Sequence, residues 1–244
     1  MAMRWWVKSA PDQHAFDGLD AVFQLQGQVV SDGPMGDVVR LRRGERTFFV
    51  KRYRNGGGHL HNWIGTPRVQ REWRNLDLFR RWGLPVPDVV GAGFRRRRGR
   101  FHQGALITVG IPDSTDLATL ARSGAGCLRD RAWVAAVSDQ VADGLRVMHA
   151  RGFCHGDMKW RNILVTGTPP RVFFIDCPAG RFWFGPFLRY RVIKDLACLD
   201  KVAKHTLSRT QRLRFYLRYT GRSRLNDADR RRIRKVLRFF QGRE

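Results

Sequence analysis

The stretch FCHGDMKWRNILV, residues 153–165, decides the fold. It places His155 two residues before Asp157, Lys159 two residues after it and Asn162 three residues further, directly ahead of an apolar run that is typical of a strand. Each of these residue types is common in polar loops. Their order becomes informative only together with the segments that flank the loop on either side.

The residues before this loop have the spacing of an amphipathic helix. Over residues 129–150 the apolar side chains fall on one stripe, and Gly152 follows as a stop signal. After the loop, NILV (residues 162–165) and RVFFID predict two short strands joined by the turn TGTPP, and the second strand ends at Asp176. From residue 190 onward helical patterns run to the end of the chain. The stripe consists of Trp133, Val137, Val141, Leu145 and Met148, and the last helix carries Ile233, Val236, Leu237 and Phe240.

The first part of the chain has the composition of strands. AVFQLQGQVV, DVVRLRRG and RTFFVKRY, within residues 21–53, are rich in β-branched and aromatic residues. LPVPDVVGAGF and ALITVG predict further strands, with RRRRGR as a solvated hairpin tip. Between these groups, the glycine-rich residues 56–66 read as a connection. PRVQREWRNLDLFRRWG then predicts a helix, because Val69, Trp73, Leu76 and Phe79 share one face.

These patterns predict an α+β protein with two lobes. We expect a small N-lobe over residues 1–110, made of an antiparallel sheet and one helix, and a mainly helical C-lobe over residues 111–244. A chain of 244 residues with 43% hydrophobic content can bury a real core.

Five side chains then fall in an order that suits phosphoryl transfer from ATP. Lys51 lies on a predicted strand and can hold the α- and β-phosphates, while Glu72 on the following helix can pair with it and fix its position. Asp157 can orient an acceptor hydroxyl and take its proton. Asn162 and Asp176 offer the oxygen ligands that Mg²⁺ prefers. The sequence therefore predicts an ATP- and Mg²⁺-dependent kinase.

Other residues near this set have predicted roles of their own. Lys159 can approach the γ-phosphate, and we expect His155 to brace the loop by hydrogen bonding. Gly33 and Gly36, in DGPMGDV, form an irregular glycine pattern. They either touch phosphate as part of the nucleotide site or only close a hairpin.

The chain resembles the protein-kinase-like superfamily over about residues 20–205, and in detail it resembles the lipopolysaccharide core kinases. That bacterial family phosphorylates Kdo or heptose in the inner core. The resemblance rests on FFVKRY, REWRNL followed by GLPVP, MHARGFCHGDMKWRNIL, FFIDCPAG and RYRVIKDLACLDK. It implies a protein-kinase-like fold, a core glycolipid as substrate, and a location in the cytoplasm, peripheral to the inner membrane. It also implies that Asp195 resembles the helix aspartate that anchors the catalytic loop.

Departures from the protein-kinase pattern limit the class of molecule that can accept the phosphate. Gly156 stands where protein kinases usually carry Arg, DCP at 176–178 replaces DFG, and no APE segment follows. A protein-substrate platform hardly fits in the remaining residues, so we expect a small molecule or a glycolipid as acceptor. The stretch RFWFGPFLRYR, 181–191, takes the place of an activation segment. Its aromatic residues either cap the core or lie at a membrane interface.

The net charge of +25 leaves alternatives open, because it attracts any polyanion. It is compatible with a core glycolipid and with peripheral contact to an anionic inner membrane. A basic nucleic-acid-binding protein is the second class, although no zinc finger, helix-turn-helix or aromatic strand motif supports it. An aminoglycoside-type phosphotransferase and a degenerate scaffold are further alternatives. The four cysteines show no metal-binding spacing, and no run is long enough to cross a bilayer.

Overall fold

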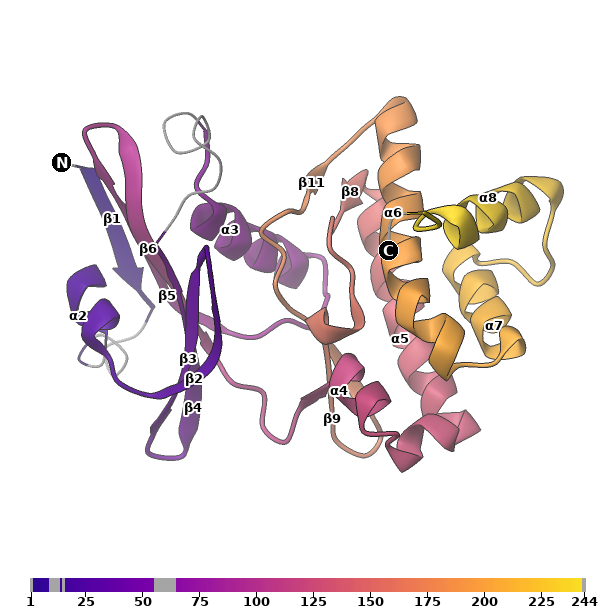
Figure 1. The fold of residues 1–244 in the computed structure, drawn as a ribbon, viewed down its shortest axis with the longest axis horizontal. Helices are drawn as coiled ribbons and strands as arrows, with labels where there is room; N and C mark the ends of the chain where they lie inside the picture. The colour runs from indigo at the N-terminus through magenta and orange to yellow at the C-terminus, as the bar shows by residue number, and fades with distance from the viewer. Residues whose placement is uncertain (1, 9–13, 15, 55–64, 243–244) are drawn as a thin grey trace. The chain divides into compact units, whose positions relative to one another are not determined.

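The computed structural model describes residues 2–8, 14, 16–54 and 65–242, and the chain divides into two compact units (Figure 1). Unit 1 comprises residues 1–81 and 86–112, and unit 2 comprises residues 82–85 and 113–244. Unit 1 is built on a sheet and unit 2 mainly on helices, as the α+β prediction requires.

The sheet of unit 1 is antiparallel throughout, with six strands in the order β1-β5-β6-β4-β3-β2. The central strand β4 lies between β3 and β6, where Lys51 is paired with Val38 and Leu106. The tip of the β5–β6 hairpin falls at Arg98 and Gly99, within the basic run that we expected there. The strands are β1 (Ala2–Val7), β2 (Gln28–Gly33), β3 (Gly36–Arg43), β4 (Arg46–Tyr53), β5 (Val89–Arg97) and β6 (Arg100–Val109).

Two helices cover opposite faces of this sheet. Alternation along β4 sends Phe48 and Val50 to one face, where they pack in a buried cluster with residues of α2 (Leu19–Gln24). It sends Tyr53 to the other face, where Tyr53 packs with Val69 and Leu76 of α3 (Arg68–Arg81). Lys51 is two residues before Tyr53, so it shares the α3 face.

Two expectations for unit 1 need correction. AVFQLQGQVV is not one strand, because Leu19–Gln24 form α2 and only the residues from Gln28 onward are extended. Leu19 and Val22, three residues apart, are buried on one side of this short helix, so its period is helical. In addition, β1 pairs with β5 at the N-terminus, where the sequence analysis predicted no strand. The glycine-rich connection expected at 56–66 lies outside the described residues except for Gly65 and Thr66.

Unit 2 is organised around the long helices α5 and α6. Asp130 caps α5 by accepting a hydrogen bond from Ala132 N, and a capping box at Ser208 begins α7. Gly144 lets α5 approach β10 (Arg171–Phe174) closely, since a Cβ atom there would lie 2.4 Å from the Phe174 ring. The helices are α4 (Leu117–Arg122), α5 (Arg131–Ala150), α6 (Gly185–Thr206), α7 (Arg209–Thr220) and α8 (Asp227–Arg238), with short 3₁₀ turns η2 (Gly126–Arg129) and η3 (Trp160–Asn162).

Short strands flank the loop formed by residues 155–162. β8 (Phe153–Cys154) precedes the loop and pairs with β11 (Arg181–Phe182), while β9 (Ile163–Thr166) follows it. β9 pairs with β10 (Arg171–Phe174) on one side and β7 (Thr115–Asp116) on the other. Residues 155–162, here called the HGD loop, are therefore tethered to sheet structure at both ends.

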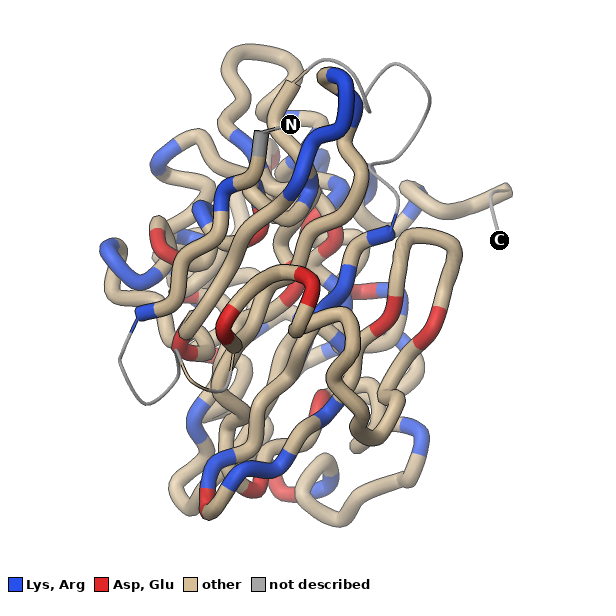
Figure 2. Tube along the Cα trace, turned by 90° about the vertical axis from the view of Figure 1, so that its left-hand side faces the viewer, with Lys and Arg blue, Asp and Glu red and all other residues tan. Residues whose placement is uncertain are grey.

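Lys and Arg residues are distributed over both units rather than confined to one segment (Figure 2). Among the described residues, no helix combines the length and the apolar character that a membrane crossing would require.

Candidate active site

A buried ion pair joins Lys51 and Glu72 in unit 1. The Lys51 Nζ atom lies 3.1 Å from both carboxylate oxygens of Glu72. The Glu72 side chain is almost fully buried, whereas Lys51 retains 26% of its side-chain exposure. The pairing forms because β4 directs Lys51 toward α3, whose buried face carries Glu72. The lysine is thus held in place by a carboxylate while its ammonium group stays partly accessible to a ligand.

Tyr53 also contributes to this pair, a role that the sequence analysis missed. Its hydroxyl donates a hydrogen bond to Glu72 Oε2, and the Lys51 ammonium lies 5.4 Å from the centre of its ring. Period-two alternation in FFVKRY would have placed Tyr53 beside Lys51, which is the available signal. A buried tyrosine needs a hydrogen-bond partner, and Glu72 supplies it.

In unit 2, Asp195 of α6 holds the start of the HGD loop. Its two carboxylate oxygens accept hydrogen bonds from the backbone amides of His155, at 2.7 Å, and Gly156, at 2.9 Å. Asp195 is completely buried, so these are charge-assisted bonds in a medium of low dielectric constant. Lys194 adds a bond from its Nζ atom to the Gly156 carbonyl oxygen at 2.8 Å.

His149 extends this network to α7. Its Nε2 atom lies 3.4 Å from Asp195 Oδ2, and its Nδ1 atom lies 2.8 Å from the Tyr219 hydroxyl. His149, Cys154 and Asp195 place ligand-type atoms within 4.8 Å of one another. Burial raises the pKa of the Cys154 thiol to about 12, which disfavours the thiolate that a metal would need. We therefore interpret the cluster as a hydrogen-bonded support.

Asp157 is presented at the accessible end of the loop. Its side chain is 28% exposed, Oδ1 lies 2.7 Å from Lys159 Nζ, and Oδ2 lies 3.5 Å from an Arg161 nitrogen. The Asn162 side-chain amide donates to the Asp157 carbonyl oxygen at 2.8 Å. The carboxylate is thus oriented by its own loop and remains within reach of a substrate hydroxyl.

Asn162 and Asp176 are brought together by the backbone. The Ile175 amide donates to the Asn162 carbonyl oxygen at 3.0 Å, so the residue that follows Ile175 lies beside the HGD loop. Asp176 has a φ of 57°, a left-handed conformation that Asp tolerates better than most residues. Because the Asn162 amide nitrogen bonds to Asp157, its side-chain oxygen is the atom left for a ligand. An amide oxygen and a carboxylate form a donor set that fits Mg²⁺.

His155 is fully buried at the base of the loop. Burial lowers its pKa, although the nearby carboxylates of Asp195, Asp176 and Asp157 act in the opposite direction. The imidazole is therefore neutral near pH 7. A buried neutral ring is consistent with the bracing role expected from the sequence and does not fit a proton-transfer role with substrate.

Gly33 and Gly36 face each other at the ends of β2 and β3, where they close a tight hairpin. Gly36 has a φ of 141°, and a Cβ atom there would lie 1.8 Å from the Arg52 carbonyl oxygen of β4. A Cβ atom at Gly33 would meet nothing within 4 Å. The hairpin explains Gly36 by backbone packing, and contact of either glycine with phosphate stays a prediction.

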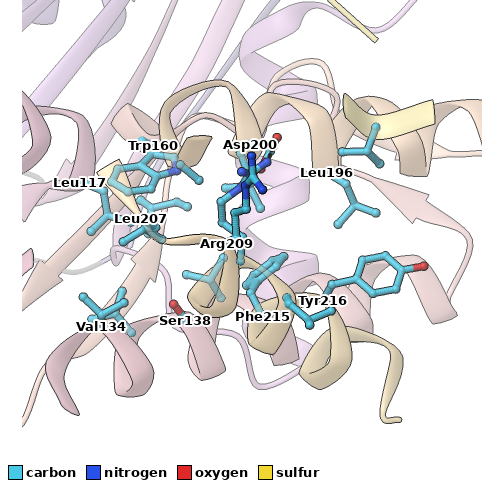
Figure 3. A pocket seen from close by; sticks show the side chains of 18 of the residues that line it. Leu117, Val134, Ser138, Trp160, Leu196, Asp200, Leu207, Arg209, Phe215 and Tyr216 are labelled. Atoms are coloured by element: carbon cyan, nitrogen blue, oxygen red, sulfur yellow. Dashed lines mark hydrogen bonds and ion pairs between the residues drawn. The ribbon is translucent and has the colours of Figure 1, made fainter. Parts of the chain in front are cut away.

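A largely apolar cavity of about 550 Å³ lies among the helices of unit 2 (Figure 3). Leu117, Val134, Trp160, Leu207 and Phe215 are among the side chains around it. None of the predicted catalytic or metal-binding residues lines it, although Trp160 belongs to the HGD loop.

Comparison with known proteins identifies the family. A search by sequence among proteins of curated function found no significant match. Among solved structures, WaaP in complex with acyl carrier protein is similar at a TM-score of 0.72 and 22% identity, over 98% of this chain and 94% of that chain. The kinase domain of PknI from Mycobacterium tuberculosis gives a TM-score of 0.49 at 17% identity, over 73% of this chain and 72% of that chain.

The similarity to WaaP confirms the protein-kinase-like fold class. A model of the lipopolysaccharide kinase (Kdo/WaaP) family matches residues 24–219, a range that contains every predicted site residue. The match favours neither nucleic-acid binding nor an aminoglycoside-type activity. The chain belongs to the lipopolysaccharide kinase (Kdo/WaaP) family, and it is an ATP-dependent kinase that phosphorylates a sugar hydroxyl of the lipopolysaccharide core.

Proposed function

We propose that Asp157 is the catalytic base of this kinase. The observation that carries the assignment is the HGD loop itself, whose start is fixed by Asp195 while Asp157 stays accessible. Asp157 accepts the proton of the sugar hydroxyl as the oxygen attacks the γ-phosphorus. Lys159, which already lies 2.7 Å from Asp157, neutralises charge on the transferred phosphoryl group.

The Asp157→Ala variant tests this role. We expect turnover to fall at least about 100-fold, the usual contribution of a general base, with ATP binding retained. Asp139→Ala is a matched control, because Asp139 has 29% side-chain exposure and pairs with Arg214 at 2.9 Å. Turnover of Asp157→Ala equal to that of the control would refute the assignment.

We propose that unit 1 is the nucleotide-binding side, with Lys51 on the α- and β-phosphates. The ion pair with Glu72 keeps the ammonium group oriented before ATP arrives. Lys51→Met should raise the KM for ATP strongly. An unchanged KM would show that Lys51 serves only the packing of α3.

Mg²⁺ is the second proposed component, and Asn162 and Asp176 would hold it. The ion would supply charge neutralisation for the phosphates of ATP. Asp176→Asn should weaken Mg²⁺-dependent nucleotide binding at least about tenfold. Asp113→Asn is the control, since Asp113 also has a left-handed φ, of 52°. A metal titration that is the same in both variants would contradict the ligand role.

The acceptor we propose is Kdo or a heptose of the inner core, presented by a membrane-embedded glycolipid at the cytoplasmic face of the inner membrane. The net charge of +25 supports attraction to such a polyanionic substrate and to the anionic membrane surface. Incubation with labelled ATP, Mg²⁺ and dephosphorylated core lipopolysaccharide, followed by mass spectrometry, tests this. A gain of one phosphate on a core sugar is expected, and no gain would refute the proposal.

An acyl carrier protein is a candidate partner, because the similar WaaP structure contains one. Co-expression of the two proteins followed by gel filtration should give co-elution. Separate elution of the two chains would argue against this partner.

A further inference from the structure

A cluster of exposed aromatic side chains lies where β11 ends and α6 begins. Phe182, Phe184, Phe187 and Tyr190 are exposed by 56%, 81%, 65% and 48% respectively. Residues 181–191 therefore do not simply cap the core, which was one of the two interpretations of this stretch. Four exposed rings within nine residues leave an apolar surface that water solvates poorly.

Arginine side chains are interleaved with these rings. The Arg191 guanidinium lies 4.4 Å from the centre of the Trp183 ring, and that of Arg181 lies 5.9 Å from it. Arg189, two residues before Arg191 on α6, is also exposed. We call residues 181–191 the aromatic–arginine patch. Aromatic rings at headgroup level together with arginines on phosphates are the combination that proteins use at the surface of an anionic bilayer.

The patch continues onto α8. Tyr190 contacts Phe239 with ring centres 5.5 Å apart, and Phe239 contacts Phe240 at 5.0 Å. α8 packs beside α6 and carries a row of exposed cations. These are Arg231, Arg234, Lys235 and Arg238. The ring contacts thus join the patch to a second helix that carries exposed cations, and this positive charge is opposite to that of a membrane that contains acidic lipids.

The patch is also mechanically linked to the HGD loop. In the β8–β11 pair, Arg181 lies opposite Cys154, the residue that precedes His155. On α6, Phe187 is eight residues before Asp195, a distance of about 12 Å along the helix. Anchoring of this end of α6 would therefore hold the loop near the surface that carries the substrate.

We propose that the aromatic–arginine patch docks this kinase on an anionic phospholipid bilayer. The inference rests on the proposed function, because it supplies the reason for contact with a membrane that presents the glycolipid acceptor. A second copy of the chain is a poorer occupant. A two-fold dimer would set the patch against itself and bring its arginines together.

Vesicle co-sedimentation without ATP or sugar tests the docking directly. The wild-type chain should bind vesicles of phosphatidylethanolamine containing phosphatidylglycerol, and bind phosphatidylcholine vesicles weakly. Phe184→Ser/Phe187→Ser should weaken binding at least about tenfold, since two rings no longer enter the interface. The control Val29→Ser/Val30→Ser removes two side chains that are 59% and 53% exposed in unit 1. Equal binding by the two double variants would overturn the proposal.

Charge reversal gives an independent test. Arg181→Glu/Arg189→Glu should weaken binding to the acidic vesicles about 30-fold or more. Arg97→Glu/Arg100→Glu changes the net charge equally at the exposed tip of the β5–β6 hairpin, and it should have a much smaller effect. Equal losses of vesicle binding in the two charge-reversal variants would show that only the overall charge matters and would refute a defined patch.

Two other outcomes would assign the patch to a different occupant. A change of oligomeric state in Phe184→Ser/Phe187→Ser would assign it to a second copy of the chain. Binding of duplex DNA in preference to vesicles, through the patch, would assign it to nucleic acid.

Kinase assays separate failure of this inference from failure of the proposed function. Phe184→Ser/Phe187→Ser should lose activity toward a vesicle-embedded acceptor and retain it toward the same core sugars without their acyl chains. Equal activity on both acceptors would refute docking while the kinase assignment stands. If the wild type phosphorylates neither acceptor, the proposed substrate fails, and vesicle binding still reports on the patch.

Discussion

Replacement of Asp195 by Asn removes one charge from a completely buried position and changes little in shape. The carboxylate uses separate oxygens for the amides of Gly156 and His155. An Asn side chain offers only one acceptor oxygen, and its NH₂ group would face the second amide donor. One backbone N–H of the HGD loop is then left without a partner in the protein interior.

The expected loss in free energy of unfolding follows from these two hydrogen bonds. A hydrogen bond to a charged group contributes about 1.5–3 kcal/mol, and an unsatisfied buried donor costs about 1–3 kcal/mol. Because Asn retains one neutral bond, we expect Asp195→Asn to lower the free energy of unfolding by about 3 kcal/mol. Such a loss is a large fraction of the usual stability of a domain.

Urea unfolding measures this loss, and hydrogen exchange locates it. The amide protons of His155 and Gly156 should exchange about 100-fold faster if the loop opens locally by that free energy. Turnover should fall as well, because a displacement of Asp157 by about 1 Å can cost about 100-fold in rate.

Asp200→Asn is the matched control on the same helix. Asp200 pairs with Arg212 through two bonds of 2.7 and 2.8 Å, and its side chain is 19% exposed. That partly exposed pair should contribute about 1 kcal/mol or less, and its loss should leave the loop amides protected. If the loop amides of Asp195→Asn exchange as slowly as those of this control, and the two variants have the same free energy of unfolding, the buried aspartate does not hold the loop.

Three further predictions concern separate parts of the chain. Gly36→Ala should lower the free energy of unfolding by about 3 kcal/mol or more in urea melts, because its Cβ would clash with the backbone of β4. Gly33→Ala should stay close to wild type, and equal melts of the two variants would show that Gly36 is not required by packing against β4. Tyr53→Phe should lower the free energy of unfolding by about 1–2 kcal/mol and raise the KM for ATP, because Glu72 loses a hydrogen-bond donor. An unchanged KM for ATP would show that the hydroxyl contributes to stability alone. Burial lowers the pKa of His155 in the folded chain, so the stability that this group contributes is complete above the unfolded pKa of about 6.5 and is lost as the pH falls below it. Urea melts at several pH values should therefore show a free energy of unfolding that falls with pH in this range, and His155→Gln should flatten that dependence.

The sequence predicted the elements that carry the site because their periodicity is strong. Alternation in FFVKRY put Lys51 on a strand, and the helical pattern of residues 67–83 put Glu72 on a helix. The two residues are 21 positions apart, and their pairing is a tertiary contact that no local pattern contains. The order of the residues along the chain led to the hypothesis that Lys51 and Glu72 pair, and the 3.1 Å contact in the structure provides the geometry of that pair.

The hydrogen-bond support of the loop was less predictable. Asp195 was singled out by resemblance, whereas Lys194, His149 and Tyr219 were not, since nothing in their local sequence shows that they meet. The residues of α2 were misread for a different reason. A helix of six residues has too few turns for its period to stand out from the strand that follows.

The behaviour of residues 181–191 shows where composition alone misleads. An aromatic run predicts burial on average, and Phe153 follows that rule while Phe184 does not. The difference lies in the backbone, because Phe153 belongs to β8, which contacts helix α6, whereas Phe184 is the N-cap residue of that helix and remains 81% exposed. Burial of an aromatic side chain is thus decided by which elements lie over it. The Tyr190 ring is exposed, lies 5.8 Å from the Arg191 guanidinium, and belongs to the helix that also holds the HGD loop through Asp195. It is therefore more informative about function than the same composition would be in a buried strand.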